Sequence, residues 1–277
     1  MTHPYLVAAP PVAFAHRGGA REAPENSLRA FHRAVSLGFE YIETDIRATA
    51  DGVPVVFHDQ SLQRVTDRVG RIRDLPFSEV KKAHIGNAER VHSLREVLDK
   101  FPRTRFNIDI KEDNAVAPIL ELLGESDFLD RICVASFSWA RLRAVRAKFG
   151  QAVCTSLAPQ EISALVSRSR LGRVSFASRL ALPKGPACVQ VPRRASRVPI
   201  ITASLVRHAH ERGWPVHAWT INDPMQMNAL LDIGVDGIVT DRPSVLRQVI
   251  DGRSRSNVSG VSNAPGRGAP GVSEPPS

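Results

Sequence analysis

Residues 41–59 read YIETDIRATADGVPVVFHD and predict two strands joined by a tight turn. YIETDI predicts a strand, VPVVFH predicts another, and Asp51-Gly52 between them is a dipeptide typical of hairpin turns. Side chains two positions apart on a strand point to the same face, so Glu43 and Asp45 lie together. Two carboxylates on one face of an otherwise apolar strand indicate a site rather than a plain structural sheet.

Short apolar runs of this kind alternate with helical patterns from residue 12 to about residue 250. The apolar runs predict strands at 12–16, 41–46, 53–58, 106–110, 131–137, 152–157, 187–191, 216–221 and 237–240. Helical patterns lie between them at 26–37, 115–124, 138–149, 159–169, 202–212, 224–233 and 243–250. This alternation predicts a mostly parallel sheet. About eight such units predict a closed (β/α)8 TIM barrel.

One segment interrupts the alternation and another ends it. Residues 59–105 are too long for a single loop and carry turn signals with two short helical patterns, so we expect an insertion or cap on the barrel rim. Residues 251–277 are rich in Gly, Ser and Pro, which predicts a disordered tail. The predicted organisation is therefore one barrel over residues 12–250, with the insertion after its second strand region.

Composition limits the classes of protein that need considering. Apolar residues make up 43% of the 277-residue chain, enough for a large core. The net charge of +9 comes from arginines spread over many segments, with no dense basic block interleaved with aromatic residues. We expect solvated surfaces that attract anionic substrates rather than a nucleic-acid site.

The N-terminus and the cysteines indicate the compartment. The first residues lack a basic region and carry prolines in their apolar run, so they predict neither a signal peptide nor a membrane span. No other apolar stretch approaches ~20 residues, so we expect no stable membrane insertion. The three cysteines, Cys133, Cys154 and Cys188, are scattered and predict neither a disulfide framework nor a zinc knuckle. We expect buried small side chains in a cytoplasmic protein.

Polar residues end several of the predicted strands. Because the carboxyl ends of barrel strands converge on one mouth, these side chains are expected to meet in space. They are His16 and Arg17, Glu43 and Asp45, His58 and Asp59, Asp109 and Lys111, and Trp219, Thr220 and Asn222.

This set predicts a metal site and an acid/base pair. Glu43, Asp45 and Asp109 are hard oxygen ligands, which suit Mg²⁺ or Ca²⁺ better than zinc. The alternative for an isolated pair of carboxylates is an ordinary ion pair with arginines. Histidine is the side chain whose ordinary pKa lies near neutral pH, so His16 and His58 suit proton transfer in phosphodiester hydrolysis.

Two cations and one further histidine accompany this set. Arg17 and Lys111 can neutralise phosphate charge, and ion pairing with the carboxylates is an equally good interpretation of each. His217 precedes Trp219 by two residues on the same predicted strand, which leaves a role at the barrel mouth open.

In order and spacing, several segments resemble the glycerophosphodiester phosphodiesterase family over roughly residues 12–248. The combination of H-R-G, E-x-D and a downstream H-D is specific, whereas any one segment alone is weak. The segments are HRGG (16–19), PEN (24–26), ETD (43–45), DGVPVVFHD (51–59), NIDIK (107–111), ASF (135–137), VQVP (189–192), AWTIN (218–222) and GVDGIVTDRP (234–243).

The resemblance implies a role for each matching residue. The general acid/base pair falls on His16 and His58, the divalent-metal ligands on Glu43, Asp45 and Asp109, the phosphate contacts on Arg17 and Lys111, a further acidic position on Glu25, and an aromatic contact to the alcohol on Trp219. Two positions depart from the family pattern. Asp109 replaces the commoner glutamate and is one methylene shorter, and Ser27 replaces the commoner threonine as a cap of the first helix.

The implied reaction is metal-dependent hydrolysis of a small-molecule glycerophosphodiester to glycerol 3-phosphate and an alcohol such as choline or ethanolamine. Attack by the substrate's own hydroxyl, through a cyclic phosphate, and direct attack by water both stay open. The resemblance implies no particular oligomeric state.

Two other functions remain as alternatives. Lysophospholipase D or sphingomyelinase D activity on acylated diesters needs an apolar groove, for which Phe57, Phe77, Ile85 and Phe137 are candidates. A non-catalytic barrel that binds phosphate groups is the other alternative, although such a module needs no acid/base pair.

Overall fold

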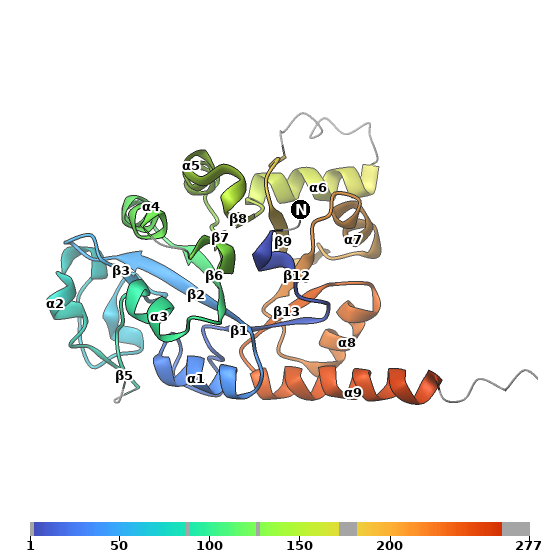
Figure 1. Ribbon diagram of the computed structural model, residues 1–277, viewed down its shortest axis with the longest axis horizontal. Helices are drawn as coiled ribbons and strands as arrows, with labels where there is room; N and C mark the ends of the chain where they lie inside the picture. Colours follow the sequence, from blue (N-terminus) through green and yellow to red (C-terminus); the bar gives the residue numbers. More distant parts are fainter. Residues whose placement is uncertain (1–2, 87–88, 126–127, 172–181, 262–277) are drawn as a thin grey trace, which may run out of the picture.

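Eight parallel strands close into a barrel, as the sequence predicts (Figure 1). The computed structural model describes residues 3–86, 89–125, 128–171 and 182–261. The strands follow one another around the ring in the order β1-β2-β6-β7-β8-β9-β12-β13, and β13 pairs with β1 to close it. Their bounds are β1 Val12–His16, β2 Tyr41–Ala48, β6 Arg105–Ile110, β7 Ile132–Ala135, β8 Cys154–Ser156, β9 Ala187–Pro192, β12 Val216–Trp219 and β13 Gly237–Thr240.

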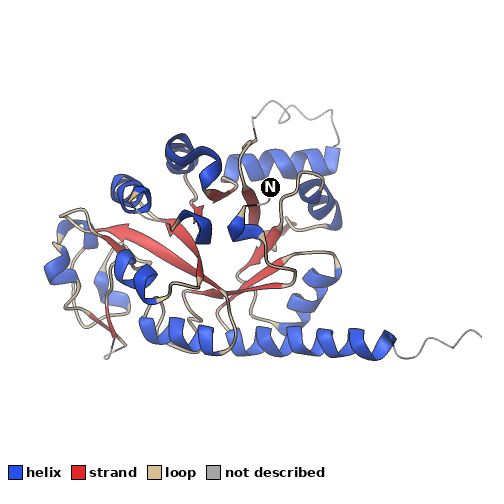
Figure 2. Cartoon of the chain, viewed as in Figure 1, coloured by secondary structure: helices blue, strands red, loops and turns tan. Residues whose placement is uncertain are grey.

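A helix follows each barrel strand and packs outside it (Figure 2). These helices are α1 Leu28–Ser36, α3 Leu94–Lys100, α4 Val116–Gly124, α5 Trp139–Phe149, α6 Pro159–Leu171, α7 Ala203–His210, α8 Pro224–Asp232 and α9 Pro243–Val261. Shorter elements join them: η1 Pro4–Leu6, η4 Asp113–Ala115, η5 Leu129–Arg131, η6 Gly150–Ala152, β10 Arg194–Ala195 and β11 Val198–Pro199.

Local sequence sets where the first helix begins and ends. The Ser27 hydroxyl accepts a hydrogen bond of 3.1 Å from the backbone N–H of Ala30, so it caps α1 as expected. Gly38 has φ +80°, a left-handed conformation that glycine adopts without steric cost, and it ends the helical segment.

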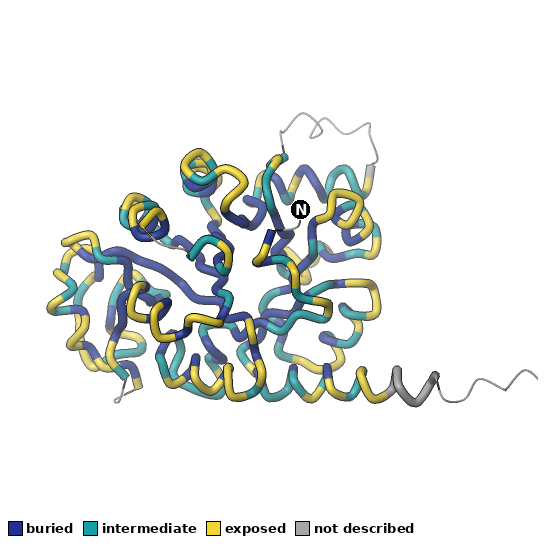
Figure 3. Tube along the Cα trace, viewed as in Figure 1, coloured by how far each residue is buried: buried dark blue, intermediate teal, exposed yellow. Residues whose placement is uncertain are grey.

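The barrel core consists of apolar side chains between the strands and the helices. Figure 3 shows the strands buried and the outer faces of the helices exposed. A separate apolar cluster fills the inside of the barrel. In this cluster the ring of Tyr5, from η1, packs edge-on against the ring of Tyr41, and the Tyr41 hydroxyl donates a hydrogen bond to the backbone carbonyl of Tyr5. The N-terminal segment therefore closes the end of the barrel opposite the strand carboxyl ends.

A small lobe interrupts the barrel after β2. Strand β3 (Pro54–Val56) turns back antiparallel to β2, and the chain continues through η2 Leu62–Arg64, η3 Ile72–Asp74, α2 Phe77–Val80, β4 His84–Ile85 and β5 Glu89–Arg90. The lobe, residues 53–91, has its own core, formed by Val55, Phe57, Leu62, Ile72, Val80, Ala83, Ile85 and Val91.

The lobe does not have the bounds expected for the insertion, residues 59–105. Its core begins on β3, and α3 contributes Leu94, Val97 and Leu98 to the barrel core instead. Both short helical patterns in this segment look alike in sequence, and only tertiary packing separates the lobe helix from the barrel helix.

The last helix is longer than the sequence pattern predicts. We expected the helix to end near residue 250 and a disordered tail to begin at 251, whereas α9 continues to Val261. Among the side chains that the structure describes, Ile250 is the last buried apolar one in α9, so the end of the apolar periodicity marks the end of the packed face and not the end of the helix. Residues 262–277 lie outside the described residues. Within the described part of the chain, no helix is long and apolar enough to span a bilayer.

Candidate active site

Strand register brings the polar strand ends together. His16 on β1 lies opposite Glu43 on β2, and Asp45 on β2 lies opposite Asp109 on β6. A cavity of about 490 Å³ opens at this end of the barrel. Its polar lining includes His16, Arg17, Glu43, His58, Asn107, Asp109, Lys111, Ser136, Ser156, Gln190 and Thr220.

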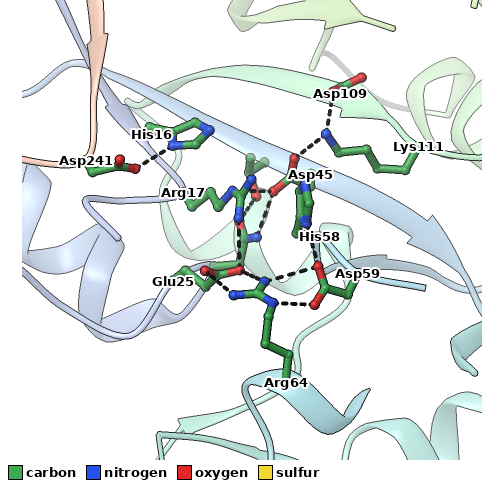
Figure 4. Close-up of polar contacts among 12 residues, drawn as sticks. His16, Arg17, Glu25, Asp45, His58, Asp59, Arg64, Asp109, Lys111 and Asp241 are labelled. Carbon is green, nitrogen blue, oxygen red and sulfur yellow. Dashed lines mark hydrogen bonds and ion pairs between the residues drawn. The ribbon is translucent and has the colours of Figure 1, made fainter. Parts of the chain in front are cut away.

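His16 is held by an acid from the last barrel strand (Figure 4). Its Nδ1 lies 2.6 Å from Oδ1 of Asp241, which directly follows β13. The other oxygen of Asp241 accepts a hydrogen bond of 2.7 Å from the Asn222 side chain, and Asn222 Oδ1 in turn accepts from the Asp241 backbone N–H. This network fixes the ring and leaves Nε2 of His16 3.7 Å from Glu43.

His58 has a matching partner on the other side of the site. Its Nδ1 lies 2.6 Å from Oδ1 of the adjacent Asp59. The guanidinium of Arg64 binds both Asp59 and Glu25, the latter with an Nη2–Oε1 distance of 2.6 Å. Arg64 therefore ties the lobe to the loop after β1 and holds the acid that orients His58 (Figure 4).

Two cations lie among the central carboxylates. Lys111 Nζ is 2.8 Å from Asp45 Oδ1 and 2.6 Å from Asp109 Oδ2. Arg17 Nε is 3.1 Å from Asp45 Oδ2, and its Nη1 donates to Glu25 at 3.2 Å. Both oxygens of Asp45 thus lie within ion-pair distance of a cation, although Oδ1 of Asp45, like Oδ1 of the buried Asp109, has no hydrogen-bond partner among the described residues.

The HRGG segment builds the turn that places Arg17. Arg17 itself has φ +52°, and Gly18 and Gly19 have φ +80° and +106°. A Cβ on Gly18 would lie 2.7 Å from the Ala30 Cβ, and one on Gly19 would lie 2.6 Å from Cγ of Pro243. Both glycines are required for conformation and for close packing, so the segment is fixed by geometry.

The model of the glycerophosphoryl diester phosphodiesterase family matches residues 16–245. The chain belongs to this family. It is 38% identical over 243 residues to the probable glycerophosphodiester phosphodiesterase 2 of Mycobacterium tuberculosis, which covers 87% of this chain and 91% of the relative. It is 29% identical over 275 residues to human lysophospholipase D GDPD3, covering 86% and 84% of the two chains.

A solved structure gives the same result. The glycerophosphodiester phosphodiesterase of Thermotoga maritima superposes with a TM-score of 0.67 at 26% identity, covering 86% of this chain and 97% of that one. Membership of the glycerophosphoryl diester phosphodiesterase family makes the chain a phosphodiester hydrolase. The family typically depends on a divalent metal.

Burial and charge shift two groups at the centre of this family site. Burial, together with the charges of Asp45 and Asp109, raises the pKa of Glu43 to about 7. Burial alone would lower the pKa of His16, but the Glu43 charge and the hydrogen bond to Asp241 raise it above its ordinary value. The site therefore concentrates negative charge around His16.

Most of the residues predicted from sequence meet in this cavity. His16, Arg17, Glu43, His58, Asp109, Lys111 and Trp219 line it. Asp45 and Glu25 lie behind Arg17 instead of lining it.

Other residues of the network had no predicted role. Asp241 and Arg64 were not singled out, while Asp59 and Asn222 were noted only as polar strand ends. Asp241 directly follows a predicted strand, so the expectation that polar residues at strand ends meet at the barrel mouth applies to it as it does to His16. Arg64 lies inside the lobe and does not follow a barrel strand, so this expectation does not apply to it.

The outer wall of the cavity is apolar. Phe137, 64% exposed, meets Trp219 edge to face with ring centroids 5.7 Å apart. Leu157, Ile162 and Ile200 line the same cavity. Of the groove candidates, only Phe137 lies here, because Phe57 and Ile85 are buried in the lobe core and Phe77 packs against it.

Proposed function

We propose that this protein hydrolyses small glycerophosphodiesters to glycerol 3-phosphate and an alcohol, with His16 and His58 as the acid/base pair. The observation that carries the proposal is the pairing of each imidazole Nδ1 with a carboxylate at 2.6 Å, Asp241 for one and Asp59 for the other. Both imidazoles line one cavity. A binding module has no use for two oriented histidines.

The carboxylate partners define what each histidine does. A carboxylate on Nδ1 fixes the tautomer and stabilises the imidazolium, so Nε2 is the atom that exchanges a proton with substrate. One histidine removes a proton from the attacking oxygen, and the other donates a proton to the alcohol that leaves. His16 comes from β1 and His58 follows β3, so the two imidazoles reach the site from different elements (Figure 4).

The carboxylates are the type of donor that a hard divalent cation takes. Glu43, Asp45 and Asp109 supply oxygen atoms, Oδ1 of Asp109 has no hydrogen-bond partner among the described residues, and burial together with the charges of Asp45 and Asp109 raises the pKa of Glu43. We propose that these three residues hold Ca²⁺ or Mg²⁺. When bound, the cation supplies Lewis-acid stabilisation of the phosphoryl oxygens.

Arg17 and Lys111 complete the proposed site. Both line the cavity and both already pair with Asp45, so they hold this carboxylate in place and add positive charge beside the phosphate. Trp219 offers an aromatic face to the alcohol portion of the substrate. The three free thiols fit the reducing cytoplasm that we propose as the location.

The test is release of glycerol 3-phosphate from glycerophosphocholine and glycerophosphoethanolamine with Ca²⁺, Mg²⁺ or EDTA. We expect release that depends on metal and is lost in folded His16→Ala and His58→Ala variants. Undiminished turnover in either variant contradicts the assigned roles, and turnover after complete metal removal removes the cation from the mechanism.

A second candidate substrate class is the acylated diester. The apolar wall formed by Phe137, Leu157 and Ile200 favours it, and a human relative of this chain is named a lysophospholipase D. Comparing glycerophosphocholine with lysophosphatidylcholine in the same assay separates the two classes. A higher kcat/KM for lysophosphatidylcholine would make the acylated diester the preferred substrate, and the proposed roles of the catalytic residues would stay the same.

A further inference from the structure

All three cysteines of the chain meet inside the barrel. Cys133 on β7, Cys154 on β8 and Cys188 on β9 are fully buried, and their sulfur atoms lie within 4.8 Å of one another. The Sγ atoms of Cys133 and Cys188 are 3.6 Å apart. Among the described residues, this is the only group of three potential metal ligands gathered so tightly. The cysteines are far apart in the sequence, so their spacing did not predict that they meet.

A histidine lies near one of the three thiols. His217 on β12 is 2% exposed, and its Nδ1 has no hydrogen-bond partner in the described structure. Its side chain interacts with that of Cys188, although it stands outside the group of ligand atoms that lie within 4.8 Å of one another. Gly237 on β13 makes room for the ring, because a Cβ there would lie 2.9 Å from Cδ2 of His217.

We propose that Cys133, Cys154 and Cys188 bind zinc at a tetrahedral site distinct from the active site, and that His217 closes onto the ion as its fourth ligand. Thiolates at about 2.3 Å from a tetrahedral Zn²⁺ lie roughly 3.8 Å apart, close to the spacing seen for Cys133 and Cys188. Three sulfurs and one imidazole are a closed ligand set of the kind that structural zinc sites use. Binding converts the thiols to thiolates and releases their protons.

A disulfide across this cluster fits less well. Strand β8 lies between β7 and β9, so the Cα atoms of Cys133 and Cys188 stand about two strand spacings, roughly 9–10 Å, apart. Disulfides require Cα atoms within about 7 Å. Cys133 and Cys154 are direct cross-strand partners, so a competing disulfide is expected to join this pair.

A cavity lies near the cluster, at the end of the barrel opposite the active site. A second cavity of about 290 Å³ is lined by Phe14, Tyr41, Trp214 and His217, with Tyr5 and Leu6 of the N-terminal segment on its rim. Its wall thus includes one proposed ligand. A metal ion at the cluster would join β7, β8, β9 and β12, which are consecutive around the ring (Figure 1).

The experiment measures metal in the full-length protein, purified with reductant and without chelator. We expect one equivalent of zinc that resists EDTA but is released by an organomercurial that captures thiols. Replacement with Co²⁺ should give a thiolate-to-cobalt charge-transfer band in the near ultraviolet and tetrahedral bands in the visible. Carboxylate ligands at the active site give no such charge-transfer band, so the two sites are distinguished.

Variants assign the ligands. Loss of a residue that only hydrogen-bonds to a metal ligand typically weakens metal binding by roughly 10–100-fold. Because Cys188 and His217 are proposed to bind the ion directly, Cys188→Ser and His217→Asn should weaken cobalt binding by more than this. His92→Asn is the matched control, because His92 is also a buried histidine, 5% exposed, but lies outside the cluster. We expect it to retain zinc and the charge-transfer band.

Two results would overturn the proposal. One is folded wild-type protein with three reduced thiols that binds neither zinc nor cobalt at the cluster. The other is a Cys133–Cys154 disulfide found by mass spectrometry under native conditions. If a ligand variant fails to fold, stripping and reloading the wild-type protein still decides between these outcomes.

Discussion

His16 depends on an acid that stands 225 positions away in the chain. Asp241 binds its Nδ1, and Asn222 in turn binds Asp241. Sequence could predict His16, because HRGG follows an apolar run, but it could not predict the pairing. Only closure of the barrel between β1 and β13 brings the two residues together.

Asp241→Asn should therefore lower kcat by about 10²–10⁴-fold, because an amide neither fixes the same tautomer nor stabilises the imidazolium. The melting temperature should change little. The matched control is Asp236→Asn, which alters a second His–Asp pair, with His210 at 2.7 Å, outside the cavity. Equal activity losses in the two variants would contradict a positioning role for Asp241.

Glu43 gives a prediction of pH dependence for metal-free protein. Its pKa rises from 4.5 to about 7 on folding, so the folded state holds the proton more tightly than the unfolded chain. The associated stability is complete below about pH 4.5 and is lost as the pH rises to about 7, on the order of 3 kcal/mol. Urea unfolding across this range, in EDTA, measures it.

Glu43→Gln is the control for that titration, because the amide keeps the shape of the side chain and carries no proton to lose. The variant should lack most of the decline in unfolding free energy between pH 5 and pH 7, and the wild type should regain stability at the upper end when Ca²⁺ or Mg²⁺ is added. Identical profiles for both proteins would assign the pH dependence to other groups.

Among the elements that the structure describes, the lobe over residues 53–91 has a core of its own outside the barrel. It presents His58, held by Asp59, to the cavity, and Arg64 joins it to Glu25 beside β1. An element with a small core of its own can open without unfolding the barrel.

Ile72→Ala should test this independence. The side chain is fully buried in the lobe, and its truncation should cost roughly 2–5 kcal/mol. We expect hydrogen exchange to accelerate in the lobe while barrel strands stay protected, with activity lost below the global melting temperature. Ile119→Ala, equally buried in the barrel core, should instead lower protection across the barrel. Uniform loss of protection in both variants would show one cooperative unit.

The elements that sequence predicted well are those with strong periodicity. The alternation of apolar runs and amphipathic stretches identified the barrel strands, because each is buried on both faces. The boundary between the lobe and α3 differs from the expected bounds of the insertion, since both segments have the same helical pattern and differ only in which core they join. The helical pattern ends near residue 250 whereas α9 continues to Val261, because a helix can extend past its last packed apolar residue.

At the scale of the whole molecule, the barrel holds two groups of potential metal ligands at different depths along its axis. Hard carboxylates and histidines gather at the carboxyl ends of the strands, and the soft thiols lie deeper, among Phe14, Tyr41 and His217. Each group comes from several strands that are distant in sequence. Sequence could predict the first because its residues follow strand ends, whereas the second lies within strands that read as ordinary apolar runs.

The net charge of +9 also acts at this scale, through the field that an approaching substrate meets. For an anionic diester such as glycerophosphoglycerol, kcat/KM should fall several-fold as ionic strength rises from about 0.05 to about 0.5 M, because salt screens long-range attraction. Zwitterionic glycerophosphocholine carries no net charge and is the control, with little change expected. The measurement is kcat/KM for both substrates across the same salt series. An equal decline for both would place the salt effect on the bound metal or the protein fold rather than on substrate capture.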